Sequence, residues 1–213
     1  MKFARRSFVT GVFALFSALT VALPAFGQAY TPITPPQPTE DAAKIEVLEF
    51  FSYGCPHCAE FNPVLSAWVA KQSADVVVRK VPVTFGRAAW TGIAKLYYTL
   101  EVTGDLHRLE SDVFKAIHGE RQNLFEEKAL TEWAVKKGVD PKKFSETFNS
   151  FGVMSKVRRG DQMAQAYKIQ GVPTLAVEGK YLVVGKDFNE MLANADKVIA
   201  QARSEKAGKG AKK

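Results

Sequence analysis

One stretch of the chain, residues 44–53 (KIEVLEFFSY), constrains the fold more than any other. It is a nearly continuous run of apolar, β-branched and aromatic residues, which is typical of a strand covered on both faces of a parallel or mixed sheet. A helix is expected to open directly after it, at Cys55, with Pro56 in the favoured first-turn position. A second strand is expected over residues 75–83. These elements together predict a β-α-β unit.

Helical spacing dominates the next part of the chain. Between residues 86 and 154 apolar residues recur at helical intervals and no strand-like run occurs, which predicts an all-helical segment. Its aromatic side chains are expected in a core and its histidines on helix surfaces. The residues concerned are Trp90, Tyr97 and Trp133, and His107 and His118.

The last third of the chain returns to the sheet. Residues 174–177 and 181–184 are expected to form two strands, joined by a turn at Glu178-Gly179-Lys180 that indicates a hairpin, and an amphipathic helix follows. The whole order predicts an α/β fold, in which a central mixed sheet with flanking helices receives an inserted all-helical subdomain.

Both ends of the chain have a biased composition. Residues 1–29 combine a basic start, an apolar run and small residues at the end, which predicts a secretory signal peptide cleaved after Ala29; general secretory and twin-arginine export both fit. Residues 30–43 contain four prolines and are expected to form an extended arm without a core of its own. Residues 202–213 are expected to form a flexible basic tail. The predicted divisions are thus 1–29, 30–43, 44–85 (first part of the α/β fold), 86–154 (helical insertion), 155–201 (second part) and 202–213.

The net charge of +7 does not indicate a nucleic-acid-binding protein. Residues 1–29 carry +3 and residues 203–213 carry +4, so the rest of the chain is neutral. A groove that follows a phosphate backbone needs Lys and Arg clustered on the folded surface. We therefore expect no nucleic-acid partner, and a monomer.

The only cysteines, Cys55 and Cys58, form one Cys-Pro-His-Cys motif. A structural zinc site needs four ligands, which the three histidines do not complete at a suitable spacing. Covalent haem needs a histidine directly after the second cysteine, where Ala59 stands, and an iron–sulfur cluster needs about four thiolates. A structural disulfide across so short a loop constrains the unfolded chain little. The motif therefore favours a redox-active disulfide, and we expect no metal and no other cofactor.

Charge around Cys55 explains why such a pair would be reactive. At a helix N-terminus, free backbone N–H groups and the helix dipole stabilise a thiolate. Pro56 supplies no N–H group, and a protonated His57 adds positive charge beside the sulfur. Together these features favour the dithiol with a thiolate over the disulfide, so the disulfide is expected to be oxidising. Cys58, one turn further in, is expected to be the buried partner.

Residues 49–58 (EFFSYGCPHC), together with residues 171–174 (GVPT), resemble the DsbA family of periplasmic thiol:disulfide oxidoreductases, in the thioredoxin superfamily. The likeness covers about residues 44–200. It implies a thioredoxin fold interrupted by a helical domain and a periplasmic location. It also implies that the protein introduces disulfides into unfolded secreted polypeptides, and that a quinone-linked membrane oxidase of the DsbB type reoxidises it.

The resemblance also assigns a substrate-binding loop. It implies that Pro173, in a cis peptide bond after Val172, faces the disulfide and pairs with the backbone of a bound peptide. From the residues alone, this segment predicts only a turn. Docking is expected over an apolar ring near Phe51, Tyr53 and Pro173.

Glu49 is a charged residue within the first apolar run, so it either points into a semi-buried pocket or lies harmlessly at the sheet edge. By resemblance it matches the family's buried acid, which accepts a proton as the inner thiol reacts. Lys80, on the next expected strand, is a candidate ionic partner.

Two alternatives to an oxidant remain. The first is a disulfide isomerase or reductase with the same motif; isomerases of this kind resemble dimers with a separate N-terminal module, and only the proline-rich arm precedes the first strand here. The second is a non-catalytic thioredoxin-fold module that binds unfolded peptides and carries a merely structural disulfide.

Overall fold

The structure is a computed structural model, and it describes residues 28–210. The predicted signal peptide lies outside the described residues, apart from Gln28 and Ala29. Within the described range the strands form one mixed sheet in the order β1-β5-β4-β2-β3. No helix between residues 28 and 210 is long and apolar enough to cross a membrane.

The central strand is β2 (Ile45–Phe51), and all of its residues are buried, as its apolar run predicts. It pairs in parallel with β3 (Val76–Pro82), to which it is connected through α1 (Pro56–Val69). On its other side it pairs antiparallel with β4 (Thr174–Val177), which continues into β5 (Tyr181–Val183). The predicted β-α-β unit and hairpin are therefore confirmed.

Between β3 and β4 the chain is helical throughout, as predicted. The elements are α2 (Ala88–Thr103), α3 (Leu106–Phe114), a π-helical turn η1 (Lys115–Gly119), α4 (Glu127–Lys136), α5 (Pro141–Phe148) and α6 (Phe151–Ala166). Side-chain caps fix two of the starts: Asp140 accepts a hydrogen bond from the Lys143 N–H group, and Ser150 from that of Val153. Tyr97 and Trp133 are buried in the core of these helices, as expected.

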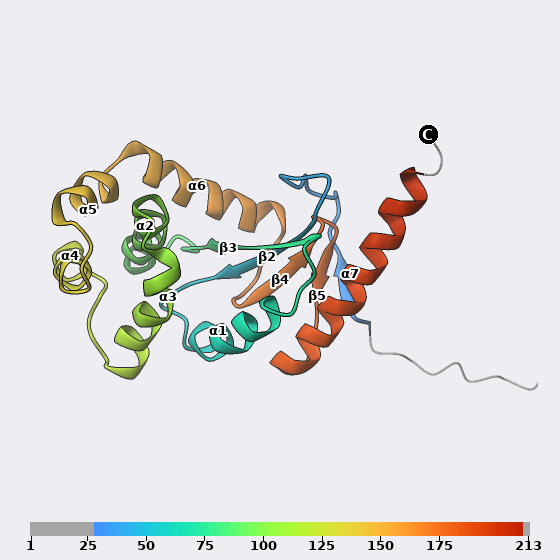
Figure 1. The fold of residues 1–213 in the computed structure, drawn as a ribbon, viewed down its shortest axis with the longest axis horizontal. Coiled ribbons are helices and arrows are strands. Elements are labelled where there is room, and N and C mark those ends of the chain that lie inside the picture. The colour runs from blue at the N-terminus through green and yellow to red at the C-terminus, as the bar shows by residue number, and fades with distance from the viewer. Residues whose placement is uncertain (1–27, 211–213) are drawn as a thin grey trace, which may run out of the picture.

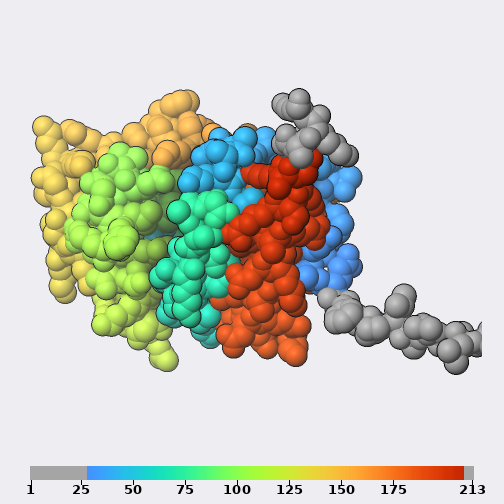
Figure 2. Space-filling model, turned by 45° about the vertical axis from the view of Figure 1, so that its right-hand side comes forward, coloured from blue at the N-terminus to red at the C-terminus, as the bar shows by residue number. Residues whose placement is uncertain are grey.

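Helices cover both faces of the sheet (Figure 1). On one face α1 and α7 (Phe188–Gly210) pack against Val47, Leu175 and neighbouring side chains. Figure 2 shows α7 in red and orange lying alongside the teal α1. On the other face α6 packs against Leu48 and Phe50. Helices α2 to α5 lie beyond the end of the sheet where β2 leads into α1, so the Cys-Pro-His-Cys motif lies next to them.

Residues 30–43, predicted to form an extended arm without a core of its own, join the main sheet at their start. Residues Tyr30–Pro32 form β1, an edge strand that pairs antiparallel with β5. Ile33 follows it and is buried, and its N–H group donates to the Lys180 carbonyl oxygen over 2.7 Å. Proline is tolerated at a sheet edge because no ladder hydrogen bond is needed from its nitrogen on the open side.

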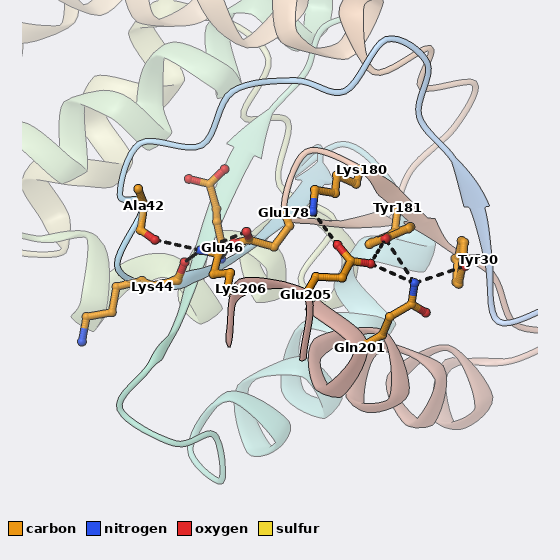
Figure 3. Close-up of polar contacts among 10 residues, drawn as sticks. All are labelled: Tyr30, Ala42, Lys44, Glu46, Glu178, Lys180, Tyr181, Gln201, Glu205 and Lys206. Atoms are coloured by element: carbon orange, nitrogen blue, oxygen red, sulfur yellow. Dashed lines mark hydrogen bonds and ion pairs between the residues drawn. The ribbon is translucent and has the colours of Figure 1, made fainter. Parts of the chain in front are cut away.

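The prediction of a flexible tail is wrong for residues 202–210, because α7 continues to Gly210; residues 211–213 lie outside the described residues. Its charged side chains bind partners far away in the sequence, so composition alone could not reveal them. Figure 3 shows two of these contacts. The ion pairs are Arg203 with Asp75 at 2.6 Å, Glu205 with Lys180 at 2.5 Å, and Lys206 with Glu178 at 2.9 Å.

Gly160 provides a test of how α6 is seated on the sheet. A Cβ atom at this position would lie 2.7 Å from the carbonyl oxygen of Pro82 in β3, so the helix would have to move away from the strand. We expect Gly160→Ala to lower the free energy of unfolding by about 1 to 3 kcal/mol, measured by urea denaturation. Gly152→Ala, in the same helix with no backbone atom near its Cβ, should cost nothing. A G160A variant as stable as the parent protein would contradict this packing.

Candidate active site

Cys55 occupies the N-cap of α1, immediately after the loop that leaves β2. Its backbone is extended, with φ −97° and ψ 119°, and Pro56 is the first residue of the helix. The Cys55 carbonyl oxygen accepts hydrogen bonds from the N–H groups of Cys58 and Ala59, both over 3.1 Å. An N-cap side chain normally accepts hydrogen bonds from the second and third helical N–H groups. In this helix those groups belong to His57 and Cys58; the Cys55 side chain makes no capping hydrogen bond to them, although both N–H groups favour its ionised form.

The surroundings of Cys55 lower the pKa of its thiol to about 6. The largest cause is the hydrogen bond from the Cys58 thiol, which stabilises the thiolate. Burial acts in the opposite direction and is outweighed. The backbone N–H groups of Cys58 and His57 and the charge of His57 also lower the pKa. Cys55 is thus a thiolate at neutral pH in this dithiol form, in which both cysteines are free.

Cys58 has the opposite character. Its side chain is fully buried, whereas Cys55 keeps 7% of its surface exposed. The hydrogen bond to Cys55 and burial both raise the pKa of the Cys58 thiol far above its ordinary value. An incoming thiolate therefore meets Cys55 first, and Cys58 remains the internal partner.

Pro56 and His57 lie on the surface of the first turn. The Nδ1 atom of His57 is 3.3 Å from a carboxylate oxygen of Glu60, and both side chains are mostly exposed. Exposed pairs of this kind stabilise a fold by less than about 1 kcal/mol. The imidazole is therefore accessible, with its charge near the thiolate and partly balanced by Glu60.

The loop before β4 lies against the reactive sulfur. The Cys55 Sγ atom is 3.4 Å from the carbonyl oxygen of Val172, a hydrogen bond that needs the protonated thiol. The Val172–Pro173 peptide bond is cis, as the resemblance implies. Val172 and Pro173 are both half-buried, so this loop borders the surface beside Cys55.

The expected apolar ring at Phe51 and Tyr53 is not on the surface. Both side chains are almost completely buried, because they pack against the neighbouring helices. The Tyr53 and Phe114 ring centroids are 4.8 Å apart, and those of Phe51 and Tyr97 are 5.4 Å apart. These two residues support the active-site loop from within and cannot form a docking surface in this structure.

Trp90 was expected in the core of the helical segment, but it lies beside the Cys-Pro-His-Cys motif. It is half-buried, and a Cβ atom at Gly54 would lie 2.7 Å from its indole nitrogen. The guanidinium carbon of Arg87 lies 4.5 Å from the Trp90 ring centroid, and the exposed Phe85 ring lies 6.2 Å away. Nothing in the sequence placed this aromatic group against the residue before Cys55, because the contact joins α2 to the turn between β2 and α1.

His118 is a second residue that the sequence did not connect with the site. It was expected on a helix surface, but it is half-buried, and its Nε2 atom lies 2.7 Å from the Tyr53 carbonyl oxygen. This hydrogen bond requires the Nε2–H tautomer. It ties η1 to the loop two residues before Cys55.

Glu49 lies in a buried pocket and not at an open sheet edge, with 1% of its side chain exposed. Lys80, its neighbour across the β2–β3 pairing, places Nζ 3.4 Å from a Glu49 carboxylate oxygen. Burial raises the pKa of Glu49 to about 7, although the charge of Lys80 opposes the shift. A buried carboxyl group that titrates near neutrality can accept or release a proton under working conditions.

Among residues 28–210, no group of three or more His, Cys, Asp or Glu side chains is arranged to hold a metal ion.

Comparison with known proteins identifies relatives of this chain. The family model for a DSBA-like thioredoxin domain matches residues 46–196. A thiol:disulfide interchange protein DsbA from Bordetella parapertussis is 42% identical over 200 residues, which cover 89% of this chain and 94% of that protein. One of the same name from Pseudomonas aeruginosa is 36% identical over 181 residues, covering 83% and 85% of the two chains.

Solved structures agree with these sequence relatives. The crystal structure of Pseudomonas aeruginosa DsbA aligns with a TM-score of 0.79 at 36% identity, covering 88% of this chain and 96% of that one. The oxidoreductase DsbA from Xylella fastidiosa aligns with a TM-score of 0.78 at 35% identity, covering 85% and 99%. The predicted α/β fold with inserted helices is thus the fold of these proteins.

The ionisation of Cys55 can be measured directly. In the reduced protein we expect the thiolate absorbance near 240 nm to appear with a midpoint at about pH 6. Alkylation by iodoacetamide at pH 6.5 should modify Cys55 and leave Cys58 untouched, as read by peptide mass spectrometry. Cys55→Ser should lack the absorbance change at this pH. A midpoint above about pH 8, near that of an ordinary cysteine, would contradict the assignment.

Proposed function

This chain belongs to the family of DSBA-like thioredoxin-domain proteins and is a thiol:disulfide oxidoreductase, and on that premise we propose that it introduces disulfide bonds into unfolded proteins exported to the periplasm. The observation that carries the proposal is the pairing of a slightly exposed sulfur that is stable as a thiolate with a fully buried sulfur that is not. Such a pair favours the dithiol, so its disulfide takes electrons from other thiols.

The reaction proceeds by two exchanges at the same sulfur. A substrate thiolate attacks the Cys55 sulfur, the Cys55–Cys58 bond breaks, and its electron pair goes to Cys58, which takes up a proton. A second substrate thiolate then attacks the substrate sulfur of this mixed disulfide. Cys55 leaves as a thiolate, which its low pKa makes a good leaving group. The substrate loses two electrons and gains a disulfide, and the protein ends as the dithiol.

Glu49 exchanges a proton with Cys58 in this mechanism. The negative charge of a Glu49 carboxylate raises the pKa of the Cys58 thiol, which supports an electrostatic coupling between the two groups. Glu49 accepts the Cys58 proton when the dithiol is reoxidised and returns it when the disulfide is reduced. Lys80 keeps the buried carboxyl group from being held permanently neutral.

The substrate lies along the surface beside Cys55. Val172 and Pro173 contact its backbone next to the reacting sulfur, and Trp90 and Phe85 offer apolar and aromatic surface on the other side of the loop. This arrangement suits unfolded chains because it recognises backbone and apolar groups and no particular sequence. Reoxidation by a quinone-linked membrane oxidase of the DsbB type then restores the disulfide. The disulfide itself is the only redox group required.

Oxidation of a dithiol peptide tests the function. Oxidised protein mixed with an equal amount of an unstructured peptide carrying two cysteines should yield the peptide disulfide and the protein dithiol in a 1:1 ratio, as read by mass spectrometry. Cys58→Ala cannot form the Cys55–Cys58 disulfide, so it should leave the peptide as the dithiol, because no oxidant is then present.

The alternatives give other results in the same experiment. An isomerase or reductase would rearrange or reduce a scrambled disulfide substrate faster than it oxidises the dithiol peptide. A peptide-binding module would retain its disulfide and leave the peptide reduced. Either outcome would overturn the proposal.

His57 should tune the oxidising power. We expect His57→Ser to shift the equilibrium with glutathione toward the protein disulfide by about three- to tenfold at pH 6 to 7, because the thiolate loses a nearby positive charge. Glu60→Gln, which removes the carboxylate beside His57, should produce either a shift below twofold or one in the opposite direction. An unchanged equilibrium in H57S would remove His57 from this role.

A further inference from the structure

A groove of about 920 Å³ lies along β3, outside the surface that the substrate uses. Its walls come from α1, α2, α3 and α6, and Lys80 and Glu110 both line it. Lys80 is the same residue that pairs with the buried Glu49. The groove therefore reaches the polar cluster beneath the active site from a side that a bound substrate does not cover.

Lys80 is shared between two acids from different parts of the chain. Its Nζ atom lies 3.4 Å from Glu49 in β2 and 2.7 Å from Glu110 in α3. It also donates a hydrogen bond over 2.7 Å to the Oδ1 atom of Asn62, one helical turn after Cys58 on α1. Lys80 is therefore nearer to Glu110 than to Glu49, and a single positive charge serves two carboxyl groups.

The exposed fraction of the side chains increases from Glu49 through Lys80 to Glu110. The exposed fraction is 1% for the Glu49 side chain, 15% for Lys80 and 20% for Glu110. The other titratable groups facing Glu49 are Cys58 on α1, Tyr97 on α2 and Tyr53 at the end of β2, and burial raises the pKa of each tyrosine well above neutrality. Glu110 is thus the acid through which Glu49 and Lys80 approach water.

We propose that Glu110 is a positioning residue for the exchange reaction: by holding Lys80 it keeps Glu49 able to bind a proton beside Cys58, and it passes that proton between Glu49 and the water of the groove. The inference rests on the proposed role of Glu49. It assigns to α3, in the stretch between β3 and β4, a direct part in the proton balance of the active site.

The step is balanced when the dithiol is reoxidised. The thiolate of Cys55 first attacks an incoming disulfide, whose own sulfur–sulfur bond breaks; one half leaves as a thiolate and the other half stays bound to Cys55 as a mixed disulfide. Cys58 then loses its proton to the Glu49 carboxylate, and its sulfur attacks the Cys55 sulfur. The Cys55–Cys58 bond forms, the bond to the incoming group breaks, and that group leaves as a thiolate. Glu49 then releases its proton through Glu110 to the groove.

The charge of Glu110 has a definite effect on Glu49. A second carboxylate beside Lys80 repels negative charge on Glu49, and Glu110 contributes in this way to the raised pKa of Glu49. Neutralising Glu110 removes the repulsion and also leaves Lys80 to Glu49 alone. Both changes lower the pKa of Glu49, so the group becomes a permanent carboxylate and a weaker base.

The test is the titration of Glu49 in the reduced protein by ¹³C NMR of labelled glutamate carboxyl groups, with the signal assigned by its loss in Glu49→Gln. The parent protein should give a midpoint near pH 7. We expect Glu110→Gln to lower the midpoint by about one pH unit. Glu110→Ala also removes this charge and leaves the open groove at that position, so it should lower the Glu49 midpoint by the same amount. The test therefore needs only one of the two variants to fold.

Glu101→Gln is the matched control. Glu101 lines the same groove and pairs with Lys156, away from Lys80, so its loss should move the Glu49 midpoint by less than roughly 0.3 pH unit. A Glu110→Gln midpoint equal to that of the parent protein, or an equal shift in Glu101→Gln, would overturn the proposal.

A kinetic measurement separates this inference from the proposed function. Reoxidation by oxidised glutathione should accelerate as pH rises through the Glu49 midpoint, and in Glu110→Gln that rise should move to lower pH by the same amount as the NMR midpoint. If the increase in reoxidation rate occurs at the same pH in Glu110→Gln as in the parent protein, the proposed role of Glu110 in proton transfer is overturned. If peptide oxidation fails while the midpoint and the rise both shift, the proposed function fails and the role of Glu110 stands.

Discussion

The stabilisation of a negative charge on the Cys55 sulfur, at the start of α1, is the interaction on which the rest of the site depends. The sulfur stands where a capping oxygen would stand, and the first N–H groups of the helix and the Cys58 thiol favour its ionised form. This charge makes Cys55 a good leaving group and the dithiol a favoured state. A buried strand and a first-turn proline fix the geometry, so the arrangement follows directly from β2 and α1.

The helices between β3 and β4 also shape the reactive loop. Trp90 packs against Gly54, His118 holds the Tyr53 carbonyl group, and Glu110 binds Lys80. Each of these contacts joins a helical residue to the region around the motif. The helical segment therefore forms part of the site as well as covering it. It places proton-carrying groups near Cys58, while Cys55 keeps a small exposed fraction of 7%.

The sequence predicted the elements whose signals are local. The β2 run, the helix that opens at Pro56 and the β4–β5 hairpin each depend on residues adjacent in the chain. The low pKa of Cys55 also has local causes, the Cys58 thiol three residues later and the first N–H groups of the helix. Prediction from the sequence failed where contacts are long-range. Phe51 and Tyr53 were expected at a surface, but helices later in the chain cover them. The two ends of the chain were interpreted from their proline and lysine content, although β1 pairs with β5 and the basic side chains of α7 form ion pairs with acids far away in the sequence.

The most direct measurement of the central claim compares the stability of the two redox forms. An ordinary disulfide stabilises a fold. Here the reduced protein should unfold at a higher urea concentration than the oxidised protein at pH 7, because folding stabilises the thiolate. Since the folded pKa of Cys55 lies below the unfolded value, this contribution is complete above about pH 9 and is lost as the pH falls through about 6. An oxidised form that is the more stable one at every pH would contradict the account.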